Sequence, residues 1–362
     1  HIAKIALRKS DQDHKLQYNN WHQQDEHSTA VQPARHIFFQ PNKNHKLLVA
    51  VLTQLAKRKR RMDRPDTVTT LKAGLIRVIA PNPSPMTYWG TNSYLLGTGP
   101  ARVLIDPGPR DAQHTQTLLN ALPQGGTVSN ILVTHGHKDH SANAQSLAHA
   151  TGAPVMAFGD ALAGRSEVMA HLATDTDIGG GEGVDLEFKP DRLVQDQQRI
   201  DTPAGQITAF HTPGHMGNHL CFAWNGCLFS GDLIMGWSSS LISPPDGDAA
   251  AFRASCQKLL QRADMALYPG HGEALPTSHA RISELLAHRA AREGQILQAL
   301  ADTPLGLPAL TRAVYGDLDA FTLRAAARNT LAHLIDLKEQ SKIDATPNLS
   351  ESAIFSRPRN KV

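Results

Sequence analysis

The sequence predicts an α/β (α+β) fold, a layered αββα sandwich that is followed by a small helical domain of the winged-helix type. Two observations predict it. Between residues 67 and 275, short runs rich in β-forming residues alternate with helical stretches, and many are bounded by Gly, Pro or Asn. After Pro276 the pattern changes to long amphipathic segments. Strands in two groups with helices between them indicate stacked layers rather than one doubly wound sheet.

Local patterns predict the individual elements. The expected strands are 75–79, 91–97, 103–105, 131–133, 207–210, 220–224, 227–229 and 265–268. The expected helices are 115–121, 142–151, 278–300, 309–315 and 319–340, with a short β tail at 342–343.

The first 61 residues differ from the rest of the chain. They contain no glycine, although the remaining residues carry all 27, and they hold 12 Lys/Arg against 4 Asp/Glu. We expect 1–61 to be a basic, disordered leader; an arm that binds nucleic acid, or a targeting signal, is the alternative. The other predicted boundaries are 62–276 for the sandwich, 277–345 for the winged-helix-like domain and 346–362 for a polar, disordered tail.

Composition narrows the class of partner. Residues 62–362 carry 24 Lys/Arg against 29 Asp/Glu, so bulk positive charge does not draw a partner to this part. No run approaches the roughly 18 consecutive apolar residues of a membrane helix, so no membrane partner is expected. The three cysteines form no CxxC pair, which argues against a disulfide framework or a thiolate zinc site and favours a reducing, cytoplasmic setting.

One segment concentrates potential metal ligands. The apolar run 131–133 leads into His135, His137, Asp139 and His140. Zinc prefers neutral imidazole nitrogen and carboxylate oxygen at about 2.0–2.2 Å. A tight loop at a strand end can turn several such side chains toward one point, and the glycine between the first two histidines permits the bend. The sequence therefore predicts a metal site at the end of this strand rather than a solvated polar loop.

Three further segments repeat the order of apolar strand and metal ligand. Run 207–210 precedes His215, run 227–229 precedes Asp232 and run 265–268 precedes His271. Taken singly, each is also what a turn or a structural histidine would give. Together with the first segment they supply a full set for two metal ions, so we predict that these side chains converge.

A pair of metal ions would explain this choice of residues. Two dications roughly 3.5–4 Å apart hold a water molecule between them and lower its pKa, so that hydroxide forms at neutral pH. One of them also polarises the carbonyl or phosphoryl oxygen of a substrate. Asp139 is the predicted catalytic residue, because it can both ligate and orient the nucleophile or pass a proton to the leaving group.

These residues resemble the metallo-β-lactamase superfamily, from about residue 73 to residue 275. The resemblance implies the four-layer αββα metallo-β-lactamase sandwich, two Zn²⁺ per chain and a metal-bridging hydroxide. It assigns His135, His137 and His215 to the first metal, Asp139, His140 and His271 to the second, and Asp232 to a bridge between them. Flavodiiron relatives carry glutamate at the position of His137, so imidazole there favours zinc over iron.

The flanking sequence resembles the β-lactamase-like protein 2 group, in which a C-terminal winged helix follows the hydrolase domain. Segments 233–248, 288–297 and 325–334 carry this resemblance. Members include a mitochondrial endoribonuclease and bacterial proteins of undefined substrate. Residues 281–344 hold eight Lys/Arg and eight Asp/Glu, whereas a wing that tracks phosphates should be basic. We therefore expect this domain to pack on the core and wall the pocket.

Two enzymatic functions remain open at this point. We predict a dinuclear zinc hydrolase that cleaves a small ester, thioester, lactone or amide, β-lactams included; the alternative is a metal-dependent endoribonuclease that acts on single-stranded RNA. The intact ligand set argues against a DNA-binding module with a metal-sensing core. A small-molecule substrate is thus the expected partner, RNA the weaker candidate, and a homodimer is left open. Candidate substrate contacts are His219, Trp237 and Ser238, and further candidates for the pocket rim are Tyr88, Trp89 and Asn92.

Overall fold

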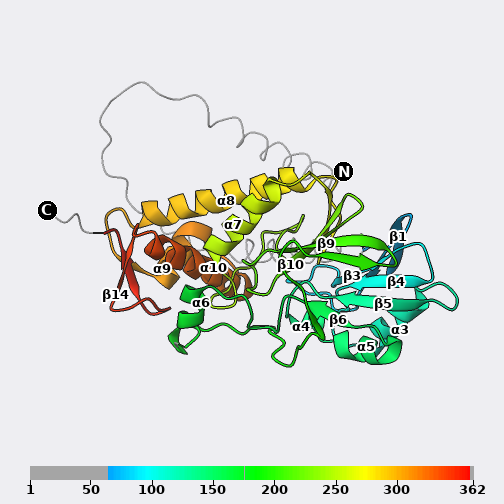
Figure 1. The fold of residues 1–362 in the computed structure, drawn as a ribbon. Helices are drawn as coiled ribbons and strands as arrows, with labels where there is room; N and C mark the ends of the chain where they lie inside the picture. Colours follow the sequence, from blue (N-terminus) through cyan, green and yellow to red (C-terminus); the bar gives the residue numbers. More distant parts are fainter. Residues whose placement is uncertain (1–63, 175, 359–362) are drawn as a thin grey trace, which may run out of the picture. The chain divides into compact units, whose positions relative to one another are not determined.

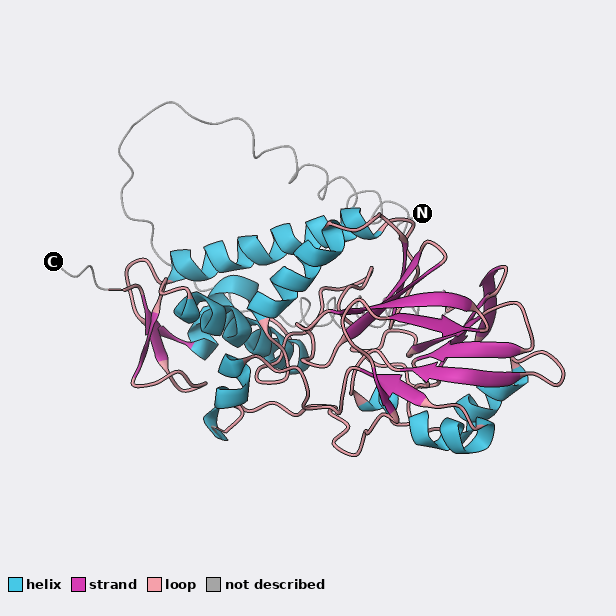
Figure 2. Cartoon of the chain, in the orientation of Figure 1, coloured by secondary structure: helices cyan, strands magenta, loops and turns pink. Residues whose placement is uncertain are grey.

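The computed structural model describes residues 64–174 and 176–358. The expected leader 1–61 lies outside the described residues, and so do the last four positions of the expected tail. Two β-sheets lie face to face, with helices on their outer sides (Figures 1 and 2). Within the described residues, no helix combines the length and the apolar character needed to cross a membrane.

The first sheet has seven strands in the order β1-β2-β3-β4-β5-β6-β7. They are β1 Val68–Lys72, β2 Leu75–Ile79, β3 Asn92–Leu96, β4 Ala101–Ile105, β5 Thr127–Leu132, β6 Val155–Ala157 and β7 Arg192–Leu193. Strands β1 to β4 pair antiparallel, and β4 to β7 pair parallel. Helices α3 (Ala112–Asn120) and α5 (Ala144–Thr151) pack on the outer face through Leu118 and Leu147.

The second sheet has five strands in the order β12-β11-β10-β9-β8. They are β8 Arg199–Thr202, β9 Gly205–His211, β10 Leu220–Trp224, β11 Cys227–Gly231 and β12 Ala266–Pro269. All pairs are antiparallel except β11 and β12, which are parallel. Helices α7 (Ala249–Leu260) and α8 (Ser278–Ala299) cover its outer face through Phe252 and Ile282.

Strand β10 shows how the sequence produces these layers. Its side chains alternate, as the two-residue period of a strand requires. Leu220, Phe222 and Trp224 belong to the core between the sheets, whereas Cys221 and Ala223 pack in the core beneath α7 and α8. The predicted αββα sandwich is confirmed. All three cysteines are free and buried.

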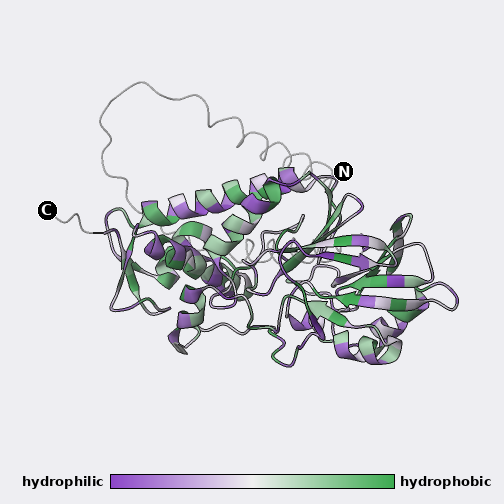
Figure 3. Cartoon of the chain, viewed as in Figure 1, coloured by the Kyte–Doolittle hydropathy of each residue, from purple (hydrophilic) through white to green (hydrophobic). Residues whose placement is uncertain are grey.

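The chain continues into a helical region with a small sheet. Its elements after α8 are β13 Leu305–Gly306, α9 Leu307–Tyr315, α10 Ala320–Glu339, β14 Asp344–Thr346 and β15 Ile354–Ser356, with strand order β13-β15-β14. Helix α8 is amphipathic, as its alternating hydrophilic and hydrophobic colours show (Figure 3). Leu310, Leu334 and Phe355 are fully buried in the core of this region. The C-terminal helices expected from the leucine pattern are therefore present.

The structure corrects the expected tail. Residues 346–356 are not disordered, because β15 pairs with both β13 and β14 and places Phe355 in the core. The polar composition of the whole segment hid this short apolar strand. Other elements also had no prediction: helices α4 Lys138–Ser141, α6 Glu167–Leu172 and α7, the 3-10 turn η1 Thr176–Ile178, and strands β1, β6, β7, β8 and β13.

Candidate metal centre

The four predicted ligand segments meet at one edge of the sandwich. They follow β5 in the first sheet and β9, β11 and β12 in the second. Hydrogen bonds tie the two sheets together here. The amide of Asn92 donates to the carbonyl of Gly270 at 2.7 Å, and the amide of Leu220 donates to the carbonyl of Thr134 at 2.7 Å. The loops that carry the ligands are therefore fixed relative to one another.

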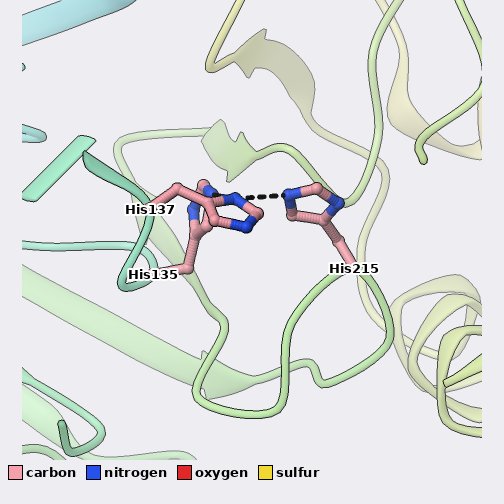
Figure 4. Close-up of side chains that lie close together, drawn as sticks. All are labelled: His135, His137 and His215. Carbon is pink, nitrogen blue, oxygen red and sulfur yellow. Dashed lines mark hydrogen bonds between the residues drawn. The ribbon is translucent and has the colours of Figure 1, made fainter. Parts of the chain in front are cut away.

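Three histidines form the first cluster. The Nδ1 atom of His137 lies 3.0 Å from the Nε2 atom of His135 and 3.0 Å from the Nε2 atom of His215. Their rings point toward one another from two loops, His135 and His137 from the loop after β5 and His215 from the loop after β9 (Figure 4). Nitrogens that share a tetrahedral zinc ion at about 2.0–2.1 Å lie roughly 3.3 Å apart. The three nitrogens therefore have the spacing of a zinc ligand set.

Asp139, His140 and His271 form the second cluster. The Nε2 atoms of the two histidines lie 3.3 Å apart. The Oδ2 atom of Asp139 is 3.4 Å from Nε2 of His140 and 3.3 Å from Nε2 of His271. A carboxylate oxygen and two imidazole nitrogens at this spacing are also suited to zinc.

Asp232 lies between the two clusters. Its Oδ1 atom is 3.4 Å from Nε2 of His140, and its Oδ2 atom is 3.3 Å from Nε2 of His271 and 3.7 Å from Nε2 of His215. Oδ1 is buried and accepts no hydrogen bond from any residue in the described part of the chain. A buried carboxylate oxygen needs a partner, and a cation would supply one. The structure thus brings all seven predicted ligands together.

Hydrogen bonds on the far side of the rings orient the histidines. Nδ1 of His140 donates to Oδ2 of Asp106 at 2.8 Å. Nδ1 of His215 donates to the carbonyl of Leu241 at 2.7 Å, and Nδ1 of His271 donates to that of Gly90 at 3.3 Å. Since the proton sits on Nδ1, the lone pair of each Nε2 faces the cluster. Partners of this kind fix the tautomer of metal-binding histidines.

Asp106 is a functional residue that sequence reasoning missed. Its Oδ1 accepts from the amide of Thr134 at 2.7 Å, and its Oδ2 accepts from the hydroxyl of Thr134 at 2.8 Å. That hydroxyl accepts in turn from Nδ1 of His135 at 3.0 Å. Asp106 therefore supports one histidine of each cluster. The signal was present in the sequence, because Asp106 follows the apolar strand β4 directly, as the metal ligands follow theirs.

Burial and charge set the protonation of the clusters. Burial lowers the pKa of His135 well below its ordinary value, that of His137 to about 4, and also that of His215. Neutral imidazole is the form that binds a metal. Burial also opposes charge on His140, but Asp139, Asp232 and Asp106 raise its pKa well above the ordinary value. The carboxylates thus create a negative potential that attracts a cation.

The comparison with known proteins agrees with this geometry. The family model of the metallo-beta-lactamase superfamily matches residues 86–271, a stretch that contains all seven side chains. The chain belongs to the metallo-beta-lactamase superfamily. It is 31% identical over 299 residues to the beta-lactamase-like protein 2 homolog of Drosophila melanogaster, a match that covers 80% of this chain and 97% of that protein.

Two further similarities bear on fold and class. The chain is 28% identical over 246 residues to the atrochrysone carboxyl ACP thioesterase of Passalora fulva, which covers 66% of this chain and 64% of that one. The crystal structure of a beta-lactamase domain protein from Burkholderia ambifaria matches with a TM-score of 0.68 and 20% identity, over 82% of this chain and 95% of that one. The similarity to the Burkholderia ambifaria structure shows the fold. The chain is thus a hydrolase of the metallo-beta-lactamase superfamily.

A cavity of about 480 Å³ opens onto the clusters, and we call it the metal-site cavity. Five of the seven ligand side chains line it: His137, Asp139, His215, Asp232 and His271. Side chains of α9 and α10 form another wall. The expectation that the C-terminal region walls the pocket of this metallo-beta-lactamase fold is confirmed.

The candidate substrate contacts divide into two groups. Trp237 and Ser238 line the metal-site cavity, as predicted. The structure corrects the prediction for His219, which is fully buried and does not line the cavity. Its ring stacks against that of His135 with centroids 5.3 Å apart, and its Nδ1 is 3.0 Å from the hydroxyl of Thr212. His219 therefore supports a metal-ligand candidate from behind.

The early loop also differs from expectation. Asn92 is buried rather than on the rim. Its side-chain Nδ2 donates to the carbonyls of Pro269 and Gly272 at 3.0 and 2.9 Å. It fastens the backbone that carries His271. Tyr88 stacks on Trp237 with ring centroids 5.0 Å apart.

Gly270 permits the close approach of backbone and ligands in this metallo-beta-lactamase site. A methyl group there would collide with Oδ1 of Asp232 and come within 2.7 Å of His140. We expect Gly270→Ala to lower kcat/KM by about 10²-fold, because small displacements of reacting groups have effects of that size. Bound metal should fall as well, which elemental analysis of the purified protein measures.

The control for this substitution is Gly294→Ala. Gly294 is exposed in α8, and a methyl group there meets nothing. Alanine should stabilise the helix by up to about 1 kcal/mol and leave metal content unchanged. Equal metal content in the Gly270 variant and the parent protein would contradict the prediction.

Proposed function

We propose that the chain is a dinuclear zinc hydrolase that cleaves a small ester, thioester, lactone or amide. The observation that carries this proposal is the convergence of seven imidazole and carboxylate side chains on one edge of the sandwich. His135, His137 and His215 would hold one ion, Asp139, His140 and His271 the other, and Asp232 would contact both. The donors favour zinc, because they combine imidazole and carboxylate without thiolate.

Bound zinc ions would supply a water molecule of lowered pKa and an electrophile for the substrate oxygen. The chain's own residues do the rest. Asp139 is the most exposed of the carboxylates in the clusters, and the hydroxyl of Thr91 holds its Oδ2 at 3.1 Å. This carboxylate can therefore exchange a proton with the leaving group in the cavity. Trp237 and Ser238, in the loop after β11, contact the substrate from the wall of the cavity.

The metal-site cavity favours a small substrate over RNA. Among the described residues that line it are three carboxylates, Asp139, Glu182 and Asp232, and no lysine or arginine. A groove that tracks phosphates needs positive charge. The similarity to a thioesterase supports a thioester or ester within the proposed class. The three buried, free cysteines support a reducing, cytoplasmic setting.

We further propose that the C-terminal region is a winged helix. Its element order is helix α8, strand β13, helices α9 and α10, then strands β14 and β15, and the strands form one sheet. The proposed boundaries are therefore about 62–276 for the hydrolase domain and 277–356 for the winged helix. Its role here is to wall the cavity, since α9 and α10 contribute Tyr315 and Phe321 to the lining.

A panel of substrates tests the proposed function. The zinc-loaded protein is incubated with nitrophenyl esters, thioesters, a lactone, a chromogenic cephalosporin and single-stranded RNA, each with and without a chelator. We expect ester or thioester turnover that chelation abolishes and added zinc restores. RNA cleavage without turnover of any small substrate would establish the endoribonuclease instead.

A further inference from the structure

A second cavity of about 530 Å³ adjoins the metal-site cavity. We call it the side cavity. The two have walls in common, formed by Met86, Glu182, Leu241, Phe321 and Ala325. Because the same side chains line both, the two cavities lie side by side along α10. The side cavity is therefore close enough to receive part of a molecule that reacts at the metal-ligand candidates.

The shared wall exposes large apolar side chains. Met86 is 39% exposed and Phe321 is 50% exposed. The other large hydrophobic side chains that the described residues expose line neither cavity. Exposed apolar surface gathered beside a site marks a place where an apolar partner binds. Leu241 extends this surface within both cavities.

Phe321 has no evident role in the fold. It lies in the first turn of α10, where the side chain of Asp319 caps the helix by accepting from the amides of Phe321 and Thr322. That cap depends on the backbone of Phe321 and not on its ring. The ring belongs to none of the apolar cores. The ring is therefore free to contact a ligand in either cavity that it lines.

The charged groups of the side cavity are largely used within the fold. Arg328 pairs with Glu351, and its Nε donates to the hydroxyl of Ser243 at 2.8 Å. That hydroxyl donates to Glu182 at 3.2 Å. These contacts link α10 to neighbouring loops. The surface left for a ligand is thus mainly apolar, apart from the exposed Arg324.

We propose that the side cavity holds the apolar chain of the substrate, so that the enzyme prefers esters or thioesters of long-chain over short-chain compounds. This inference rests on the proposed function and specifies its substrate class. Each methylene moved from water into an apolar channel contributes about fourfold to binding. We therefore expect kcat/KM to rise about fourfold per methylene until the channel is full, mainly through KM.

Two matched series test this preference. In the first, p-nitrophenyl esters vary in acyl chain from acetate to decanoate; in the second, S-alkyl thioacetates vary in the alkyl chain. A steep rise in kcat/KM in either series supports the proposal. Rates that are flat with chain length in both series overturn it, while still leaving the hydrolase function in place.

A binding measurement tests the apolar channel without requiring the enzyme to turn over a substrate. Calorimetric titration with hexanoate, octanoate and decanoate compares ligands that share a carboxylate, so differences report the chain. Affinity should rise about fourfold per methylene, with a negative heat-capacity change. If no ester or thioester is hydrolysed but binding follows this series, the proposed function fails and the channel stands. If the three ions bind equally, the channel does not exist.

Variants locate the channel. Phe321→Ala should weaken decanoate binding at least about fivefold and lower the ratio of kcat/KM for decanoate over acetate esters by a similar factor. Phe321 is half exposed, so this change does not threaten folding. Leu186→Ala is the matched control, since Leu186 is 70% exposed and lines neither cavity. An equal loss of decanoate affinity in both variants would show that the apolar chain of the ligand binds outside the side cavity.

Discussion

Replacing Asp232 by asparagine is expected to lower kcat/KM by at least about 10³-fold. Mutation of a residue that only hydrogen-bonds to a metal ligand typically lowers metal affinity or activity by about 10- to 100-fold. Within the described residues, Asp232 is the carboxylate within 3.7 Å of nitrogens from both clusters. An amide is neutral, and one of its two ends donates hydrogen bonds instead of accepting them. It therefore cannot present two anionic oxygens to a pair of ions.

Kinetics and metal analysis together check this expectation. The purified variant should bind less than two zinc ions per chain and should turn over slowly even at saturating zinc. The control is Asp201→Asn, because Asp201 is exposed in β8 and its side chain accepts a single hydrogen bond, from Gln206. Full activity in the Asp232 variant would refute the assignment of this residue to both ions.

Replacing Asp106 by asparagine is expected to lower zinc affinity by about 10- to 100-fold. The carboxylate keeps the proton of His140 on Nδ1, which leaves Nε2 free to face the second cluster. An asparagine amide that donates to Nδ1 would move the proton to Nε2, where it faces the cluster. The backbone should tolerate the change, because Asp106 has a φ of 54° and asparagine adopts this conformation readily.

Zinc titration with a competing chelator measures this loss. A purely structural role would lower thermal stability and leave the zinc affinity of the folded protein unchanged. The control is Asp191→Asn, whose side chain accepts from the amide of Val155 at 2.8 Å and lines neither cavity. We expect that variant to keep its affinity. Wild-type zinc affinity for the Asp106 variant would rule out the positioning role.

The ligand segments could be predicted because their signal is local. Each consists of a few apolar residues followed at once by histidine or aspartate, and the strand makes the loop position predictable. The long helices were equally accessible. Predictions of 278–300 and 319–340 compare with α8 at Ser278–Ala299 and α10 at Ala320–Glu339. Leucine periodicity sets these bounds without any knowledge of tertiary packing.

Features that depend on tertiary contacts could not be predicted. The sequence places His219 near His215, but only the packing of the two sheets turns its ring behind His135 instead of into the cavity. Asn92 lies beside candidate rim residues in sequence, yet the approach of β3 to β12 buries it. Phe355 stands in a polar segment, and its burial depends on the pairing of β15 with β14, just before it, and with β13, far earlier in the chain.

The wall that α9 and α10 contribute to the metal-site cavity has an evolutionary consequence. The proposed metal ligands come from segments that follow strands of the sandwich, whereas Phe321 and Ala325 come from a separate helix. Mutations in that helix can alter which molecules fit while the ligand geometry is inherited unchanged. We expect related proteins that share the seven ligand residues but differ in α10 to catalyse the same reaction on different substrates.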